Sequence, residues 1–405
     1  MKKRRIVVTG IGVVNPCGVG KNVFWENITR GVYGIKQITR FDSSDSPIKV
    51  AGEIKEFNVE EYVPKRMMVK CDRFTHYALA ATGMALEDSE LEISEDNEYR
   101  CGIFYGNNSG GWDICERGFY EMYNDGCTMV NPWQATAWFQ AAPQGYTAIR
   151  YGIKGLSKTF VADRVSGSSA IYFSILSILT EQNDITITGG TEAPITPFGV
   201  ICYHESGEMS NSLDPITACK PFDKDSSGIV LGEGSTVLIL EELDHAIGRG
   251  AHIYGEITGW AMGVGESQDI ESMEKCMKSA ILKSRLSLED IDLLVPEGNG
   301  AEISDYVERT AINNLWKYIP KKLPVTLPKS LCGHLYGAST STDVACGLLA
   351  INSGLLPECK NSYEVKQDHF EIVNNINKPK TINNVLVNSR SREGVNVSFV
   401  LSRYN

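Results

Sequence analysis

The chain has 405 residues, of which 42% are hydrophobic, and its formal net charge at pH 7 is -11. This length and apolar content exclude a disordered chain and predict one large globular domain or two. The acidic balance argues against nucleic acid as a partner, although a local basic patch could still receive an acidic protein.

Two further absences narrow the class of protein. No apolar stretch approaches the about 20 residues that cross a bilayer, so no membrane association is expected. The 11 cysteines are scattered without paired metal-type spacing. We therefore expect reduced thiols in a cytoplasmic protein that binds neither a metal nor another cofactor.

Short apolar runs alternate with amphipathic segments along the chain, which predicts an α/β protein whose sheets are covered by helices. In chain order, the expected strands are 6–10, 158–162, 185–189, 235–241, 253–259, 293–297, 325–327, 385–389 and 396–401. The expected helices are 72–87, 166–181, 270–284, 305–316 and 339–352.

Two short fragments occur twice in the same order. Residues 8–11, Val-Thr-Gly-Ile, recur as Ile-Thr-Gly-Trp at 257–260, and Leu-Glu-Asp at 86–88 recurs at 288–290. If the fragments are copies, they indicate two duplicated halves around a pseudo-two-fold axis. A solenoid would need more copies at a fixed period.

The middle of the chain resembles the long signature of the β-ketoacyl synthases, in residues 220–234 and on through 240–251. Residues 8–12, 189–193, 329–330 and 333–334 belong to the same pattern, so the resemblance covers nearly the whole chain. It implies the thiolase fold, with duplicated βαβαβαββ halves in a five-layered α-β-α-β-α arrangement and an obligate dimer. We expect the halves to be 1–250 and 251–405, in one compact unit.

The residues of the ketosynthase active site are changed in this chain. The family uses a cysteine at a helix N-terminus and two histidines that polarise a malonyl thioester. The matching positions hold Arg164, Glu297 and His334. A guanidinium cannot carry an acyl group, and a carboxylate repels the enolate that condensation must stabilise. His334 is either a remaining catalytic residue or a hydrogen-bonded core residue.

The two replacements suggest a contact of their own. Because the parent side chains face one cavity, Arg164 and Glu297 could form a buried ion pair that plugs it. An unpaired charge there would cost about 3 to 5 kcal/mol. The alternative is that Arg164 contacts Asp163 or a backbone carbonyl.

Further segments resemble the chain length factors, the β-subunits of type II polyketide synthases. These segments are 136–145, with its Ala-Trp-Phe run, and 161–164, although chain length factors usually have glutamine where Arg164 stands. Ketosynthases carry a Gly-Phe-Gly-Gly-Thr-Asn gate near the C-terminus, and the gating phenylalanine is Arg392 here. We expect no active catalytic residue among Arg164, Glu297, His334 and Arg392.

The resemblance also implies a helix that closes a product tunnel. Trp112, Cys115 and Phe119 have the i, i+3, i+7 spacing of one helix face. Two bulky residues around a small one predict a product of about eight acetate units. The alternative is an ordinary core stripe. Gln134, Trp138 and Phe139 are expected at the interface with the partner.

The function that the resemblance implies is that of a non-condensing chain length factor. It would form a heterodimer with a ketosynthase α-subunit, and an acyl carrier protein would bring the growing poly-β-ketone of an aromatic product. Two alternatives stay open. One is a stand-alone malonyl-carrier decarboxylase or acyltransferase that uses His334 with Asn299, and the other is the β-subunit of a polyene-forming type II synthase.

Overall fold

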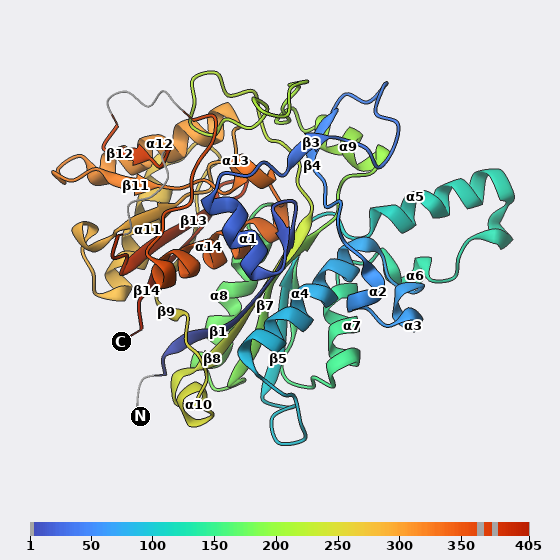
Figure 1. Ribbon diagram of the computed structural model, residues 1–405, viewed down its shortest axis with the longest axis horizontal. Coiled ribbons are helices and arrows are strands. Elements are labelled where there is room, and N and C mark those ends of the chain that lie inside the picture. Colours follow the sequence, from blue (N-terminus) through green and yellow to red (C-terminus); the bar gives the residue numbers. More distant parts are fainter. Residues whose placement is uncertain (1–3, 363–367, 375–379, 405) are drawn as a thin grey trace.

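The computed structural model describes residues 4–362, 368–374 and 380–404 (Figure 1). Its strands are β1 (Ile6–Asn15), β2 (Gly18–Val19), β3 (Ile35–Gln37), β4 (Val50–Gly52), β5 (Cys101–Gly106), β6 (Lys158–Phe160), β7 (Ile185–Glu192), β8 (Gly234–Glu242), β9 (Gly255–Val264), β10 (Leu293–Val295), β11 (Leu323–Val325), β12 (Phe370–Ile372), β13 (Asn384–Arg390) and β14 (Val395–Ser402).

The helices alternate with these strands. They are α1 (Lys21–Thr29), α2 (Val59–Tyr62), α3 (Lys65–Met68), α4 (Arg73–Ser89), α5 (Trp112–Tyr120), α6 (Gln134–Ala137), α7 (Ala142–Tyr151), α8 (Ser166–Leu179), α9 (Pro197–His204), α10 (Leu243–Gly248), α11 (Ile270–Ser284), α12 (Glu302–Trp316), α13 (Lys329–Cys332) and α14 (Ser339–Ser353). Short turns of other helix types are η1 (Glu121–Asp125), η2 (Cys127–Met129), η3 (Leu288–Asp290) and η4 (Tyr336–Ala338).

The main sheet has the same strand order in both halves of the chain. It runs β6-β5-β7-β8-β1 in the first half and β11-β10-β13-β14-β9 in the second, with β12 added beside β11. The halves meet where β1 pairs with β9, through Val7 with Glu256 and Val8 with Gly255. The sheet is mixed, as expected for helices that cross over between its parallel strands.

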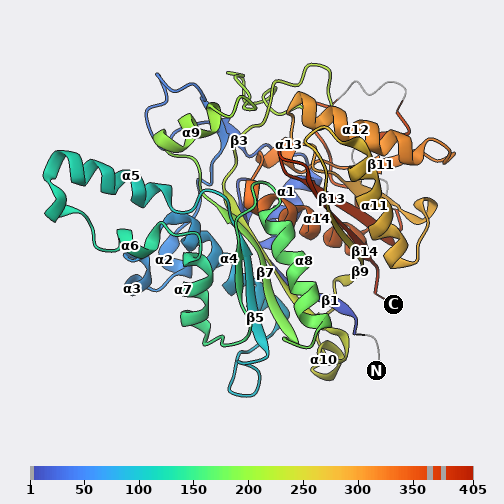
Figure 2. The same cartoon turned by 180° about the vertical axis from the view of Figure 1, so that it is seen from behind.

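Helices cover this sheet in layers (Figures 1 and 2). α8 and α14 pack against each other between the two halves, while α4 lies on β1 and β8 and α11 lies on β9 and β14. The result is the five-layered thiolase fold, which confirms the predicted fold class. The boundary at residue 250 stays a prediction.

One of the two repeated fragments is a true structural copy. A Cβ on Gly10 would lie 2.3 Å from the carbonyl oxygen of Ala85 in α4, and one on Gly259 would lie 2.1 Å from that of Ala280 in α11. Each glycine therefore lets a strand approach its own outer helix closely. The Leu-Glu-Asp fragment was a wrong match, because 86–88 lies inside α4 whereas 288–290 forms η3 beyond the end of α11.

All nine expected strands and all five expected helices are present, with bounds that differ by a few residues. β10 ends at Val295 rather than at residue 297, because Pro296 has no N–H to donate to the sheet. Among the described residues, none of the helices is both long enough and apolar enough to span a bilayer.

Candidate functional site

Arg164 lies at the turn between β6 and α8, two residues before the helix begins. Its side chain is buried, and the residue is only 1% exposed. Nε donates to Asp163 Oδ2 at 3.2 Å, and Nη2 lies 3.5 Å from Glu208 Oε1. Burial opposes the charge, but Asp163, Glu208 and Glu297 together raise the pKa of the guanidinium. Arg164 is thus a permanently charged group inside the protein.

Glu297 lies on the loop after β10, and α12 fixes the shape of that loop. Glu308 accepts hydrogen bonds from the backbone N–H groups of Glu297 at 2.9 Å and Gly298 at 2.8 Å. Asp305 accepts from the backbone N–H groups of Asn299 and Gly300, both at 3.1 Å. These two carboxylates of α12 therefore hold Glu297 in a defined position.

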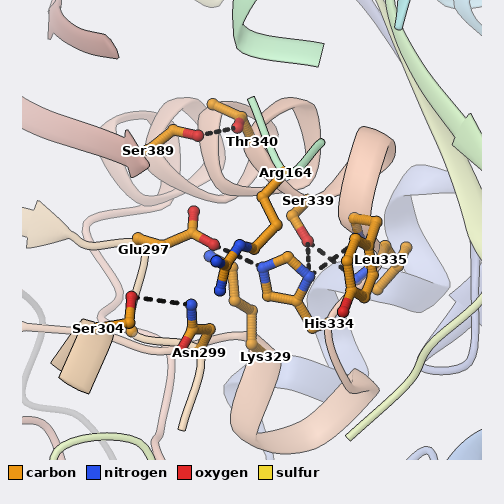
Figure 3. A network of polar contacts seen from close by, with 12 residues as sticks. Arg164, Glu297, Asn299, Ser304, Lys329, His334, Leu335, Ser339, Thr340 and Ser389 are labelled. Carbon is orange, nitrogen blue, oxygen red and sulfur yellow. Dashed lines mark hydrogen bonds and ion pairs between the residues drawn. The ribbon is translucent and has the colours of Figure 1, made fainter. Parts of the chain in front are cut away.

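The histidine that the sequence retains, His334, follows α13, and both of its ring nitrogens make hydrogen bonds (Figure 3). Nδ1 accepts from the backbone N–H of Tyr336 at 3.0 Å, and Nε2 lies 2.6 Å from Glu297 Oε1. A backbone N–H can only donate, so Nδ1 carries no proton and the proton is on Nε2. Burial also lowers the pKa of His334. The ring is neutral and donates its N–H to Glu297.

Glu297 is the charged member of this pair. Its burial would raise the pKa of the carboxyl, but His334, Lys329 and Arg164 lower it to about 2. Lys329 is itself buried, and it donates to Asp343 and to the carbonyl oxygen of Pro296, the latter at 3.2 Å.

The expected ion pair between Arg164 and Glu297 is wrong. Both side chains enter the same region (Figure 3), but Arg164 binds Asp163 and Glu208 while Glu297 binds His334. Among the described residues, Arg164 Nη1 and Glu297 Oε2 have no hydrogen-bond partner. Glu208, which belongs to no sequence motif, lies closer to Arg164 than Glu297 does. Arg164 and Glu297 therefore shift each other's pKa without direct contact.

Arg392 joins the same cluster from the turn between β13 and β14. Its backbone N–H donates to Asp163 Oδ2 at 3.0 Å, and its Nε lies 3.8 Å from Glu208 Oε2. The two arginines therefore share the same two carboxylates. All four degenerate positions of the sequence pattern lie in one region.

The start of α5 is held by two buried carboxylates. Glu192, at the end of β7, accepts from the backbone N–H groups of Asn108 at 2.8 Å and Ser109 at 2.9 Å. Asp72 accepts from Ile114 N–H at 2.8 Å. The glycines before α5 are needed for packing: Gly110 has φ +70, and a Cβ there would lie 2.5 Å from the Trp138 carbonyl oxygen.

α5 presents Trp112, Cys115 and Phe119 to one side, and we call these three residues the α5 face. Trp112 and Cys115 are half-buried, whereas Phe119 is exposed. The α5 face is therefore not an ordinary core stripe along its whole length. With η1, η2 and α6, α5 forms an arm that projects from the body (Figures 1 and 2).

A chain of aromatic side chains links the α5 face to His334. Trp112 lies 5.8 Å from Tyr203, Tyr203 lies 4.4 Å from Tyr336, and Tyr336 lies 5.0 Å from His334, measured between ring centroids. Both tyrosines are buried. Side chains therefore fill the direct path between Trp112 and His334 within this chain.

The predicted interface residues differ in exposure. Trp138 and Phe139 are exposed, with their rings 5.9 Å apart. Gln134 is half-buried, and its Nε2 donates to the carbonyl oxygen of Ile114. Gln134 therefore ties α6 to α5, which the sequence did not indicate.

Other residues of the site gave no usable sequence signal. Glu208, Tyr203 and Tyr336 stand outside the changed catalytic positions, and only their spatial approach shows their place in the site. Within residues 4–362, 368–374 and 380–404, no group of three or more His, Cys, Asp or Glu side chains is placed to hold a metal ion.

Comparison with known proteins identifies the family. Residues 3–246 match the family described as "Beta-ketoacyl synthase, N-terminal domain", and residues 254–362 match "Beta-ketoacyl synthase, C-terminal domain". The chain is 32% identical to the "Putative polyketide beta-ketoacyl synthase 2" of Streptomyces coelicolor, over 99% of this chain and 95% of that protein. It is 31% identical to the 3-oxoacyl-(acyl-carrier-protein) synthase 2 of Staphylococcus aureus, over 100% and 99% of the two chains.

Solved structures give the same result. "The ishigamide ketosynthase/chain length factor" matches with a TM-score of 0.90 and 26% identity over 100% of both chains. A type II polyketide synthase carrier protein in complex with its ketosynthase, AntDE:AntF, matches in fold with a TM-score of 0.89 and 23% identity over 100% of both chains. The chain belongs to the beta-ketoacyl synthase family.

Proposed function

We propose that this chain is a non-condensing chain length factor that pairs with a cysteine-bearing ketosynthase. The observation that carries the proposal is the state of Arg164, which is buried at the nucleophile position and bound to Asp163 and Glu208. A guanidinium cannot form an acyl thioester. The growing chain must therefore be attached to the cysteine of the partner.

The remaining polar groups of the site support the same proposal. The Nε2–H of His334 is donated to Glu297, so it is not free to polarise a thioester. The amide of Asn299 is also engaged, because Nδ2 donates to Ser304 Oγ at 3.1 Å and Oδ1 accepts from Ala301 N–H at 2.9 Å. These contacts argue against a stand-alone decarboxylase or acyltransferase that uses His334 with Asn299.

The contribution of this chain is then the shape of the product cavity. The α5 face is partly open, and the buried Tyr203 and Tyr336 close the path from Trp112 to the changed site of the same chain. A product that reaches the α5 face would therefore come from the site of the partner. From the sizes of Trp112, Cys115 and Phe119 we expect a poly-β-ketone of about eight acetate units, which a carrier protein would deliver for an aromatic product.

The test is reconstitution with a candidate ketosynthase, carrier protein and malonyl units. We expect the two subunits to co-purify, the product to form only when both are present, and intact mass to show the acyl thioester on the partner alone. A partner variant whose nucleophilic cysteine is replaced by alanine is the matched control, and it should abolish product formation.

Two results would overturn the proposal. One is an acyl thioester on this chain when it is purified without companions. The other is release of carbon dioxide from malonyl carrier by this chain alone at the rate of the complex. Either result would favour the alternative that this chain is a stand-alone enzyme.

A further inference from the structure

Helix α9 has an open apolar side next to the α5 face. Phe198 is 45% exposed and Ile201 is 49% exposed, while Val200 and Tyr203 point into the core. Positions 198 and 201 are one turn apart on the same side of the helix. α9 therefore adds apolar surface that no motif of the sequence indicated.

Phe198 contacts both bulky residues of the α5 face. Its ring centroid lies 5.5 Å from that of Trp112 and 6.4 Å from that of Phe119. Trp112 and Phe119 are seven residues apart, which is about two helical turns. Phe198 thus spans the interval between them, opposite the turn that carries Cys115.

The relative position of α9 and α5 is fixed by hydrogen bonds. Glu116, on α5, accepts from Thr196 Oγ1 at 3.0 Å and from the backbone N–H of Phe198, and so caps the N-terminus of α9. Gly199 allows Trp112 to pack closely, since a Cβ there would lie 2.7 Å from Trp112 Cε3. Phe198 is held at a set distance from the α5 face.

We propose that Phe198 is a specificity-determining residue, which closes the product cavity together with Trp112 and Phe119. This inference rests on the proposed function. In this arrangement two helices form the wall, and the small side chain of Cys115 does not leave a gap, because Phe198 covers the space between its bulky neighbours. The size of the residue at 198 then limits chain length as strongly as that at 119.

The test compares single variants in the reconstituted heterodimer, with product length read by mass. Phe198→Ala is expected to lengthen the main product by at least one acetate unit, and Phe198→Trp to shorten it. The tryptophan variant keeps an apolar surface at the interface, so it tests the inference even if the alanine variant assembles poorly. Tyr318→Ala, at an exposed aromatic residue outside the wall, is the matched control and should leave the product unchanged.

The outcomes separate this inference from the proposed function. If Phe119→Ala lengthens the product while both Phe198 variants give the parent length, the assignment of Phe198 is wrong and the chain length factor remains. If Trp112→Ala, Phe119→Ala and Phe198→Ala all give the parent length, the chain does not set product length and the proposed function fails with the inference.

Discussion

His334 shows how a single backbone contact fixes the state of a side chain. The N–H of Tyr336 occupies Nδ1, so the ring must keep its proton on Nε2 and donate it to Glu297. Glu297, which stands where the family has its other histidine, thus also binds His334. The changed position Glu297 and the retained His334 thus act as one unit, although 37 residues separate them in the chain.

The first prediction concerns Glu297. Replacing it with alanine leaves the buried N–H of His334 without an acceptor, which is expected to lower the free energy of unfolding by about 1 to 3 kcal/mol. Glu297→Gln keeps an acceptor oxygen and should cost less. Urea denaturation at pH 7 measures both, with Glu289→Ala on the exposed surface as the control. Equal midpoints for Glu297→Ala and Glu289→Ala would contradict the buried contact.

The same carboxyl predicts a pH dependence. Its pKa of about 2 in the folded chain lies below its ordinary value of 4.5. A lowered pKa stabilises the fold above the ordinary value, and that stability is lost as pH falls toward 2. Between pH 6 and pH 3 the parent should therefore lose more stability than Glu297→Gln, which does not titrate. Parallel falls in the urea midpoint for the two proteins would show that Glu297 does not contribute.

At the scale of elements, the strand–helix pairs β1–α4 and β9–α11 pack in the same way. Gly10 and Gly259 occupy equivalent places, each beneath a helix carbonyl oxygen. This match supports a duplication of the fold more strongly than the four-residue sequence fragments that indicated it. It also shows why the copies retain a glycine although their neighbours differ.

The third prediction tests this close approach. Gly259→Ala places a Cβ 2.1 Å from the Ala280 carbonyl oxygen, so the helix must move, at a cost of about 1 to 3 kcal/mol. Gly263→Ala, on the same strand, meets no atom within 4 Å and should change stability by less than about 0.5 kcal/mol. Thermal melts of the two variants and the parent provide the comparison, and equal losses would show that β9 is not packed this tightly.

The sequence predicted the elements with long apolar periodicity and missed those without it. α8, α11 and α14 were predictable because their apolar residues recur at helical spacing over many turns. β5 was missed because it has only six residues, with glycine at its second position, Gly102, and at its last, Gly106. α7 was missed because it contains Pro143 and Gly145. The changed catalytic positions were predictable from motifs, and Asp163 was among the expected partners of Arg164. The second partner, Glu208, was not predictable, because it reaches Arg164 only through the turn after α9.

At the scale of the whole molecule, one end of the main sheet is open. β6 pairs with β5 and is the last strand of the order on this side in the described part of the chain. Phe173 of α8 stacks on Phe160 of β6 with ring centroids 5.0 Å apart, and it is 39% exposed. Asn107 donates to the carbonyl oxygens of both Phe160 and Gln140, so the segment with Trp138 and Phe139 lies beside this edge.

An unpaired strand edge with exposed aromatics is the kind of surface that obligate partners cover. The fourth prediction is that Phe173→Asp abolishes co-elution with the proposed ketosynthase partner in size-exclusion chromatography while the circular dichroism spectrum stays that of the parent. Leu282→Asp, at an exposed residue of α11, is the control and should co-elute normally. Co-elution of Phe173→Asp at the parental level would show that the interface does not include this edge.

The carboxylates around Arg164 also bear on how such a subunit evolves. A cysteine restored at this position would face Asp163 and Glu208, which disfavour the reactive thiolate, and the histidine it needs would still be engaged by Glu297. Under the proposed function, we therefore expect that Arg164→Cys alone does not give a condensing enzyme. If the chain works only with a ketosynthase, as proposed, the genes of the two subunits are expected to be inherited together.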